Sequence, residues 1–140
     1  MKAQAGTSQA RSTSPIFKGA KAFPSFSTKD LKKAKEFYGQ TLGLKVSESA
    51  EGLELQLADG LHVFIYPKPN HTPASFTVLN FKVDDIDETL DELKSQGITP
   101  EKYNQPDLKT DAKGIMSGDG MRVAWFKDPS GNILSVIEEG

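Results

Sequence analysis

The second half of this chain repeats the pattern of the first half. Phe26–Leu31 aligns with Phe81–Ile86 at an offset of 55 residues, Gly43-Leu44 with Gly97-Ile98 at 54, and Gly60 with Gly131 at 71. Each half therefore predicts the order strand, helix, strand, strand, strand. Such a half exposes an apolar sheet face and is not expected to be stable alone, so the two halves should pair. The larger last offset places the extra residues in a loop over 104–120.

Local patterns place the elements within each half. In the first half we expect a strand over 21–27, a helix over 30–42 with Thr28 as its N-cap and Gly43 as its C-cap, and strands over 44–49, 52–58 and 61–67. In the second half we expect strands over 75–83, 97–103, 114–117, 121–127 and 132–139 and a helix over 84–96. Asp85 and Glu88 resemble a capping box at the start of that second helix. The fold class is therefore α+β.

Composition limits the chemistry that the chain can perform. There are 140 residues, no cysteine and two histidines, which excludes disulfides, thiolate nucleophiles and cysteine-based metal sites. The chain has 17 basic and 19 acidic residues, and this balance argues against a nucleic-acid partner. No apolar run approaches the ~20 residues of a membrane span, so we expect no membrane partner and a cytoplasmic protein.

The chain divides into a tail and one domain. Residues 1–20 are predicted to be a flexible N-terminal tail, and residues 21–140 a single domain with modules over 21–67 and 75–139. An organellar targeting segment is the alternative for the tail, because residues 1–29 contain lysines and an arginine and no acidic residue. Pro15, Gly6 and Gly19 interrupt the amphipathic helix that such a segment needs, and a secretory signal would need an apolar region that is missing.

Two motifs carry a resemblance to a known group of proteins. The segments STKDLKKAKEFYGQTLGLKV and WFKDPSGNILSVIEE, together with the duplicated modules, resemble the vicinal oxygen chelate superfamily. This superfamily includes glyoxalase I, extradiol dioxygenases, fosfomycin-resistance transferases and bleomycin-resistance proteins. The resemblance covers residues 23–139 and implies a curled mixed sheet with an open cleft and helices on its outer face. It also implies a homodimer and, in the metal-dependent members, a divalent ion in the cleft.

The positions that hold the metal ligands in those members can be carried over to this chain. The two first-strand positions hold Phe23 and Val78, and the two last-strand positions hold Phe64 and Ser135. Divalent ions prefer carboxylate oxygens or imidazole nitrogens, and these four residues provide neither. A shift by one residue would turn each side chain to the other face of its sheet. We therefore expect no metal and no other cofactor.

Alternation along the strands then defines a cleft surface that is mostly apolar and aromatic. The expected ligand-binding residues are Phe23, Ser25, His62, Phe64, Tyr66, Val78, Asn80, Trp125 and Ser135. Alternation alone does not decide whether Trp125 faces the cleft. His62 could act as a base, although nothing in the sequence places a carboxylate beside it. His71 lies in a proline-rich linker and is expected to face solvent.

These observations lead to three hypotheses. The first is a binding protein without catalytic residues that takes a small hydrophobic or aromatic organic molecule without a metal, similar to the bleomycin-resistance type. The second is a cofactor-free enzyme, such as an isomerase or lyase, that uses His62, Tyr66 or Ser135. The third is a structural module whose cleft is filled by its own side chains.

Overall fold

The computed structural model describes residues 16–140 and has the expected α+β fold of two βαβββ modules. The first module consists of β1 (Ser25–Thr28), α2 (Leu31–Lys35), the π-helical turn η2 (Glu36–Thr41), β2 (Lys45–Glu48), β3 (Leu53–Gln56), the 3₁₀ turn η3 (Ala58–Gly60) and β4 (His62–Pro67). The second consists of β5 (Thr77–Lys82), α3 (Ile86–Ser95), β6 (Asn104–Gln105), β7 (Leu108–Lys109), β8 (Ile115–Gly118), β9 (Met121–Lys127) and β10 (Ile133–Glu139). Residues 1–15, which make up most of the predicted tail, lie outside the described part. Between residues 16 and 140 no helix is long and apolar enough to cross a membrane.

The two modules form two four-stranded mixed sheets with the same topology. Sheet A has the order β1-β4-β3-β2, and sheet B has the order β5-β10-β9-β8. In each sheet the first strand of the module lies parallel to the last strand. Ser25 pairs with Phe64 in sheet A, and Asn80 pairs with Ser135 in sheet B. These two pairs are related by the offsets of 55 and 71, so the register of both sheets follows the sequence repeat.

The repeat also fixes where both helices begin. Asp30 and Asp85 are the N-caps of α2 and α3, with nearly identical extended backbone angles (φ −135°, ψ 104° and φ −138°, ψ 102°). The Asp30 carboxylate accepts a hydrogen bond from the Lys33 amide at 3.1 Å, and that of Asp85 accepts one from the Glu88 amide at 3.0 Å. The prediction of Thr28 as N-cap is wrong, because Thr28 belongs to β1 and lies two residues too early.

Three element boundaries differ from the sequence-based prediction for local reasons. β1 begins at Ser25 rather than at residue 21, directly after Pro24, which has no amide hydrogen for a ladder. The predicted helix over 30–42 changes to π-helical geometry after Lys35, and the Leu42 amide bonds the Phe37 carbonyl, five residues earlier, at 2.9 Å. Residues 97–103 form no strand, although the Glu101 amide donates to the Trp125 carbonyl at 2.8 Å.

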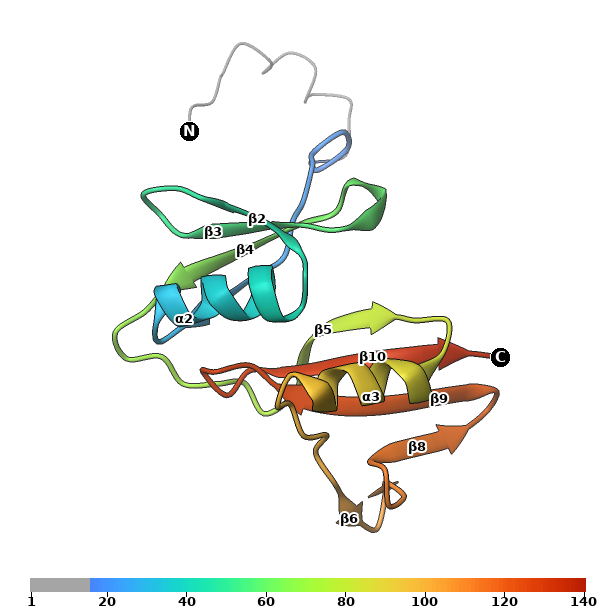
Figure 1. Ribbon diagram of the computed structural model, residues 1–140. Coiled ribbons are helices and arrows are strands. Elements are labelled where there is room, and N and C mark those ends of the chain that lie inside the picture. Colours follow the sequence, from blue (N-terminus) through green and yellow to red (C-terminus); the bar gives the residue numbers. More distant parts are fainter. Residues whose placement is uncertain (1–15) are drawn as a thin grey trace.

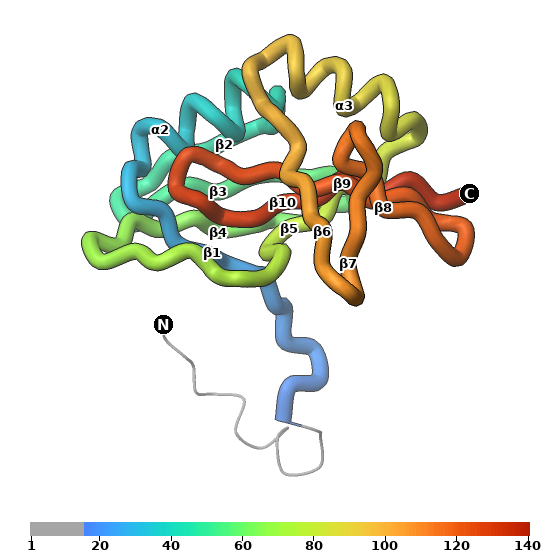
Figure 2. Tube along the Cα trace, turned by 90° about the horizontal axis from the view of Figure 1, so that it is seen from below, coloured from blue at the N-terminus to red at the C-terminus, as the bar shows by residue number. Residues whose placement is uncertain are grey.

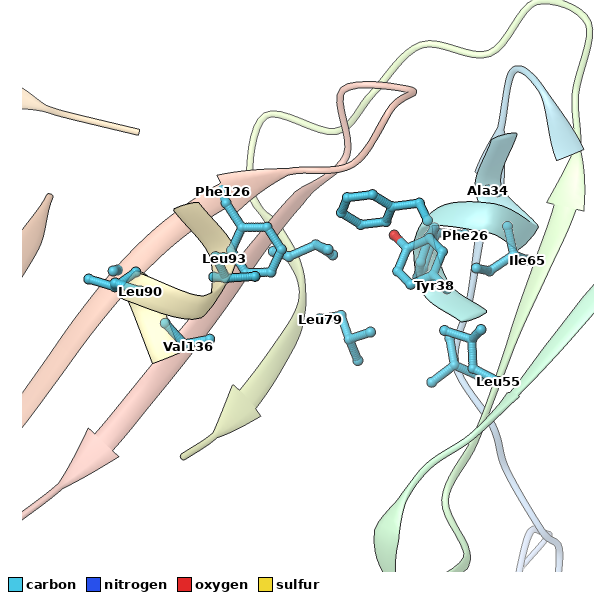
Figure 3. Packing of buried hydrophobic residues seen from close by; sticks show 14 of the residues in the cluster. Phe26, Ala34, Tyr38, Leu55, Ile65, Leu79, Leu90, Leu93, Phe126 and Val136 are labelled. Carbon is cyan, nitrogen blue, oxygen red and sulfur yellow. The ribbon is translucent and has the colours of Figure 1, made fainter. Parts of the chain in front are cut away.

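The helix-covered faces of both sheets contribute to one hydrophobic core. Phe26, Leu55 and Ile65 from sheet A belong to the same buried cluster as Phe126 and Val136 from sheet B. Leu79 of β5 lies between the two groups of side chains (Figure 3). In Figure 1, α2 lies between sheet A and sheet B, and α3 covers the near face of sheet B. Figure 2 shows both helices along one side of the molecule. In each sheet, the face that is not covered by its helix therefore points outward, away from this core.

A group of polar contacts, which we call the module joint, connects the two modules. Its centre is the buried hydrogen bond from the Tyr38 hydroxyl on η2 to the Asp128 carboxylate in the β9–β10 turn, with 2.7 Å between the oxygens. The Asn132 side chain donates to the same carboxylate and to the carbonyl of Ser27, both at 2.9 Å. Burial, with the neighbouring Asp128 charge, raises the pKa of Tyr38 well above its ordinary value, so the phenol remains a donor.

His71 also belongs to the module joint, and the prediction that it faces solvent is wrong. Its Nδ1 lies 2.7 Å from the Ser27 hydroxyl of β1, and its Nε2 lies 3.0 Å from the Ser130 carbonyl. The hydroxyls of Thr28 and Ser130 are 2.7 Å apart on the other side of β1. The linker between the modules is thus attached both to the first strand of one module and to the last turn of the other.

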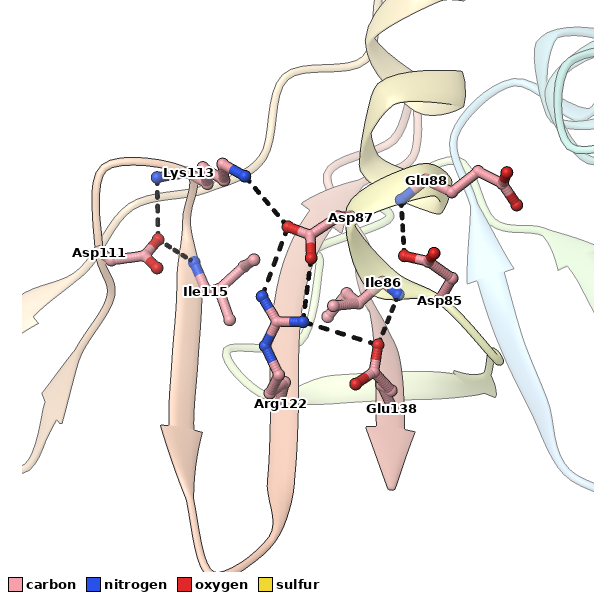
Figure 4. A network of polar contacts seen from close by, with 9 residues as sticks. All are labelled: Asp85, Ile86, Asp87, Glu88, Asp111, Lys113, Ile115, Arg122 and Glu138. Carbon is pink, nitrogen blue, oxygen red and sulfur yellow. Dashed lines mark hydrogen bonds and ion pairs between the residues drawn. The ribbon is translucent and has the colours of Figure 1, made fainter. Parts of the chain in front are cut away.

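A second polar network holds the N-terminal end of α3 (Figure 4). Arg122 of β9 donates to the Asp87 carboxylate at 3.0 Å, and Lys113 donates to it at 3.1 Å. Glu138 accepts a hydrogen bond from the Ile86 amide at 2.9 Å and lies 3.6 Å from Arg122. Hydrogen bonds from Arg122 and then Lys113 lower the pKa of Asp87. The network ties α3 to β9, to β10 and to the turn before β8.

Removal of the Tyr38 hydroxyl is expected to destabilise the protein. Tyr38→Phe removes one hydrogen bond to the carboxylate of the buried residue Asp128, and a hydrogen bond to a charged group contributes about 1.5–3 kcal/mol. We expect the free energy of unfolding from urea denaturation to fall by this amount. Tyr66→Phe is the matched control, because Tyr66 is 36% exposed and a surface change stays within about 0.5 kcal/mol. Equal effects of the two substitutions would contradict the role of the module joint.

The network on α3 predicts a shift in the titration of Asp87. Because its pKa in the folded protein lies below its ordinary value of 3.8, the ionised carboxylate stabilises the fold above that value, and this contribution is lost as the pH falls through the folded pKa. We expect Arg122→Gln to raise the pKa of Asp87 towards 3.8, as measured by carboxyl NMR. Lys94→Gln, on the same helix, is the control and should leave the titration unchanged. An unchanged midpoint in Arg122→Gln would contradict the ion pair.

Candidate functional site

The outward face of sheet A, here called face A, carries four of the predicted ligand-binding residues, Ser25, His62, Phe64 and Tyr66. Burial alternates along β1 and β4, so that Phe26, Val63 and Ile65 are buried while the residues between them point outward. Face A thus contains Ser25, Ser27, Glu54, Gln56, His62, Phe64 and Tyr66. The rings of Phe64 and Tyr66 stack with centroids 6.3 Å apart and planes at 18°. They form a flat aromatic surface suited to a planar apolar ligand.

His62 has a carboxylate partner on face A. Its Nδ1 lies 2.9 Å from a carboxylate oxygen of Glu54 on the neighbouring strand β3, and both side chains are about half exposed. The sequence patterns placed no carboxylate beside His62, and the structure supplies one in Glu54. The pairing of Gln56 with His62 and of Glu54 with Phe64 across the β3–β4 hairpin makes Glu54 and His62 diagonal neighbours. Counting outward from the Ala58–Gly60 turn would have found this pair.

The outward face of sheet B, here called face B, contains Thr77, Asn80, Val123, Trp125, Ile133, Ser135 and Ile137. Trp125 pairs with Ser135 across β9 and β10, which places it on this face and decides what alternation left open. Its indole donates to the Thr77 hydroxyl at 3.1 Å, and Tyr103 packs edge-on against it at 5.5 Å. Burial raises the pKa of Tyr103, with a smaller contribution from Glu101.

Three of the predicted residues are placed differently from the sequence-based expectation. Ser135 is fully buried, and its hydroxyl donates to the Asn80 side chain, so it presents no free group to a ligand. Val78 is the extra residue of a bulge between β5 and β10 and packs against the core instead of lying on face B. Phe23 precedes β1 and is 64% exposed.

The donor set at the four metal-ligand positions does not fit a divalent ion. Phe23, Phe64 and Val78 have no donor atom, and the Ser135 hydroxyl is already bonded to Asn80. Within residues 16–140 there is no group of three or more His, Asp or Glu side chains arranged to hold a metal. His62, two residues before Phe64 on β4, is paired with Glu54.

Face A and face B do not meet within one chain. Both sheets turn their helix-covered faces towards the common core, so the two outward faces lie on different sides of the molecule (Figure 1). The aromatic pair of face A and the Trp125 region of face B therefore cannot contact one small ligand in a single chain. The sequence repeat predicted both faces but contained no information on how the modules are oriented.

A groove lies elsewhere, between the helices of the two modules. This groove of about 480 Å³ is bounded by the segment after η2, by α3 and by the edge strand β5, including Leu42, Leu44, Phe81 and Leu93. No predicted site residue lines it. The groove results from the packing of one module against the other, which no local sequence pattern records.

Comparisons with known proteins agree on the fold. Residues 23–136 match the family model described as the Glyoxalase/Bleomycin resistance protein/Dioxygenase superfamily. The uncharacterized protein YraH of Bacillus subtilis (strain 168) is 30% identical over 124 residues, covering 78% of this chain and 90% of that protein.

Solved structures of lower identity share the same fold. One is TnmS3, an antibiotic binding protein from Streptomyces sp. CB03234, with a TM-score of 0.58, 24% identity, and coverage of 86% of this chain and 97% of that one. Another is FosX, a fosfomycin resistance protein from Listeria monocytogenes, with a TM-score of 0.63, 15% identity, and coverage of 86% and 93%.

Proposed function

The chain belongs to the glyoxalase/bleomycin resistance protein/dioxygenase superfamily, and we propose that it binds a small aromatic or hydrophobic molecule without a metal. The observation that supports this proposal most directly is the replacement of all four metal-ligand positions by Phe23, Phe64, Val78 and Ser135. The stacked pair Phe64 and Tyr66, together with Trp125, supplies flat apolar surfaces for such a ligand. TnmS3, an antibiotic binding protein, shares the fold and is consistent with this kind of role.

We further propose that the binding cleft forms between two copies of the chain. Face A and face B point outward from one chain, and both carry exposed apolar side chains, among them Tyr66 (36% exposed) and Met121 (39% exposed). A two-fold axis that places face A of one copy on face B of another generates a second, identical contact. The dimer would then have two clefts, each built from both modules.

One observation favours a second function, that of a cofactor-free enzyme. The Glu54 carboxylate beside His62 Nδ1 orients the imidazole so that Nε2 is directed away from that contact, as in general-base catalysis. A lyase or isomerase that uses this pair would act on a ligand held against Phe64 and Tyr66. Loss of turnover in Glu54→Gln with retained ligand binding would separate this function from simple binding.

Ligand binding is expected to alter the emission of Trp125, which is the single tryptophan of the chain. We expect saturable changes in fluorescence and matching calorimetric binding for at least one member of a panel of aromatic antibiotics and metabolites. Tyr66→Ala should weaken this binding about tenfold, which corresponds to about 1.4 kcal/mol of lost aromatic contact. Phe17→Ala, at an 81% exposed position outside both sheets, should have no effect. A tightly bound divalent ion found by elemental analysis of the purified protein would contradict the metal-free proposal.

Mixing two defective variants tests the composite cleft. Tyr66→Ala on face A and Trp125→Ala on face B should each lower calorimetric binding of a ligand found in the panel. After subunit exchange, half of the dimers are mixed, and each mixed dimer contains one unaltered cleft and one doubly altered cleft. About a quarter of the sites should therefore regain full affinity. No recovery, or a monomer in sedimentation velocity, would contradict a cleft shared between two copies.

A further inference from the structure

We propose that Ser27 and His71 form a nucleophile–base pair that hydrolyses small activated esters. The two residues come from β1 and from the linker between the modules, 44 positions apart in the chain, and the Ser27 hydroxyl lies 2.7 Å from His71 Nδ1. Neither residue belongs to the aromatic pair on face A or to the predicted ligand-binding set. A hydroxyl bonded to an imidazole that is itself oriented by a third group is the arrangement of an activated serine.

Hydrogen-bonding rules determine the tautomer of His71. Its Nε2 lies 3.0 Å from the backbone carbonyl of Ser130, which can only accept, so Nε2 carries the hydrogen. A neutral imidazole has a single N–H group, and Nδ1 must therefore be an acceptor. The hydrogen between Ser27 and His71 then belongs to the Ser27 hydroxyl and points at a basic nitrogen. This is the protonation state in which the oxygen can attack an electrophile.

The surrounding structure holds the base in position. The His71 amide donates to the Lys68 carbonyl at 3.0 Å, and the Lys68 amide donates to the Thr28 carbonyl at 3.0 Å. The Ser130 amide is fixed in turn by the Asp128 carboxylate at 2.8 Å. The imidazole thus lies on the module joint, where hydrogen bonds hold it and its neighbours, and such preorganisation favours reaction at a fixed geometry.

The position of the pair also determines the class of substrate. Ser27 and His71 are both only partly buried, and Ser27 lies beside Tyr66 in the register of β1 and β4. An aromatic group held next to Ser27 would lie on the stacked rings of Tyr66 and Phe64. Aryl esters of short carboxylic acids combine such a group with a good leaving oxygen.

The reaction uses only the ester and water. The Ser27 oxygen forms a bond to the acyl carbon while its proton passes to His71 Nδ1, and the bond from that carbon to the aryl oxygen breaks. The proton on Nδ1 then passes to the leaving aryl oxygen, which departs as a phenol. Water attacks the acyl-serine with the same proton transfers, which releases the carboxylic acid and restores the Ser27 hydroxyl.

Two probes test the pair in the full chain. We expect 4-nitrophenyl acetate to give a burst of about one 4-nitrophenolate per chain, as acyl-serine intermediates do. A fluorophosphonate should give one adduct per chain, which peptide mass spectrometry assigns to Ser27 in the unaltered protein. An unaltered protein with no adduct at Ser27 would overturn the proposal, whatever the variants do.

The variants separate chemistry from folding. Ser27→Ala should abolish the adduct, and His71→Gln should slow its formation by roughly 10²–10⁴-fold. Ser47→Ala removes another hydroxyl from sheet A and should have no effect. Thr28→Val removes the Thr28–Ser130 contact from the module joint but leaves the pair intact, so labelling should persist. If Thr28→Val slowed labelling as much as His71→Gln, His71 would have only a structural role and the proposal would be wrong.

Discussion

The buried contact between Tyr38 and Asp128 is the interaction on which the arrangement of this molecule depends. A carboxylate that is 6% exposed needs donors, and Asp128 receives them from the Ser130 and Asn132 amides, from the Asn132 side chain and from the Tyr38 hydroxyl. The first three belong to its own turn, whereas the fourth comes from the other module. Because the buried Asp128 carboxylate needs hydrogen-bond donors, its bond from Tyr38 holds the helix of the first module against the last turn of the second. His71 and Ser130 strengthen the same junction from the other side of β1.

The orientation set by this junction explains why the two candidate faces are separate. Each module covers one face of its sheet with its own helix and leaves the other face free, and the junction turns both covered faces towards a shared core. The aromatic surface of Phe64 and Tyr66 and the surface around Trp125 therefore lie on separate faces of the same chain. Both faces carry aromatic side chains next to polar groups, and such a surface suits the binding of organic molecules.

Much of the fold could be predicted from the sequence, because residues related by the sequence repeat have the same helix-cap geometry and the same strand register in both modules. Asp30 and Asp85 cap their helices in the same way, and the pairs Ser25–Phe64 and Asn80–Ser135 follow the same offsets. The exposure and the partners of individual site residues could not be predicted, because they depend on contacts between segments that are far apart in the sequence. The bulge that turns Val78 into the core and the burial of Ser135 arise from how β10 pairs with its neighbours. The partners of His71 come from residues 44 and 59 positions away, beyond the reach of any local pattern.

The two turns that end the modules have the same backbone bonds but different side chains. The Leu57 amide bonds the Leu61 carbonyl at 2.8 Å, as the Asp128 amide bonds that of Asn132 at 3.0 Å, so Leu57 is the counterpart of Asp128 at the offset of 71. At the offset of 55, Leu93 is the counterpart of Tyr38. A tandem chain of two first modules would place a phenol against leucine, and one of two second modules would bury a carboxylate against leucine. The two modules therefore share a backbone topology but differ in the side chains of this one contact, which needs one module of each kind.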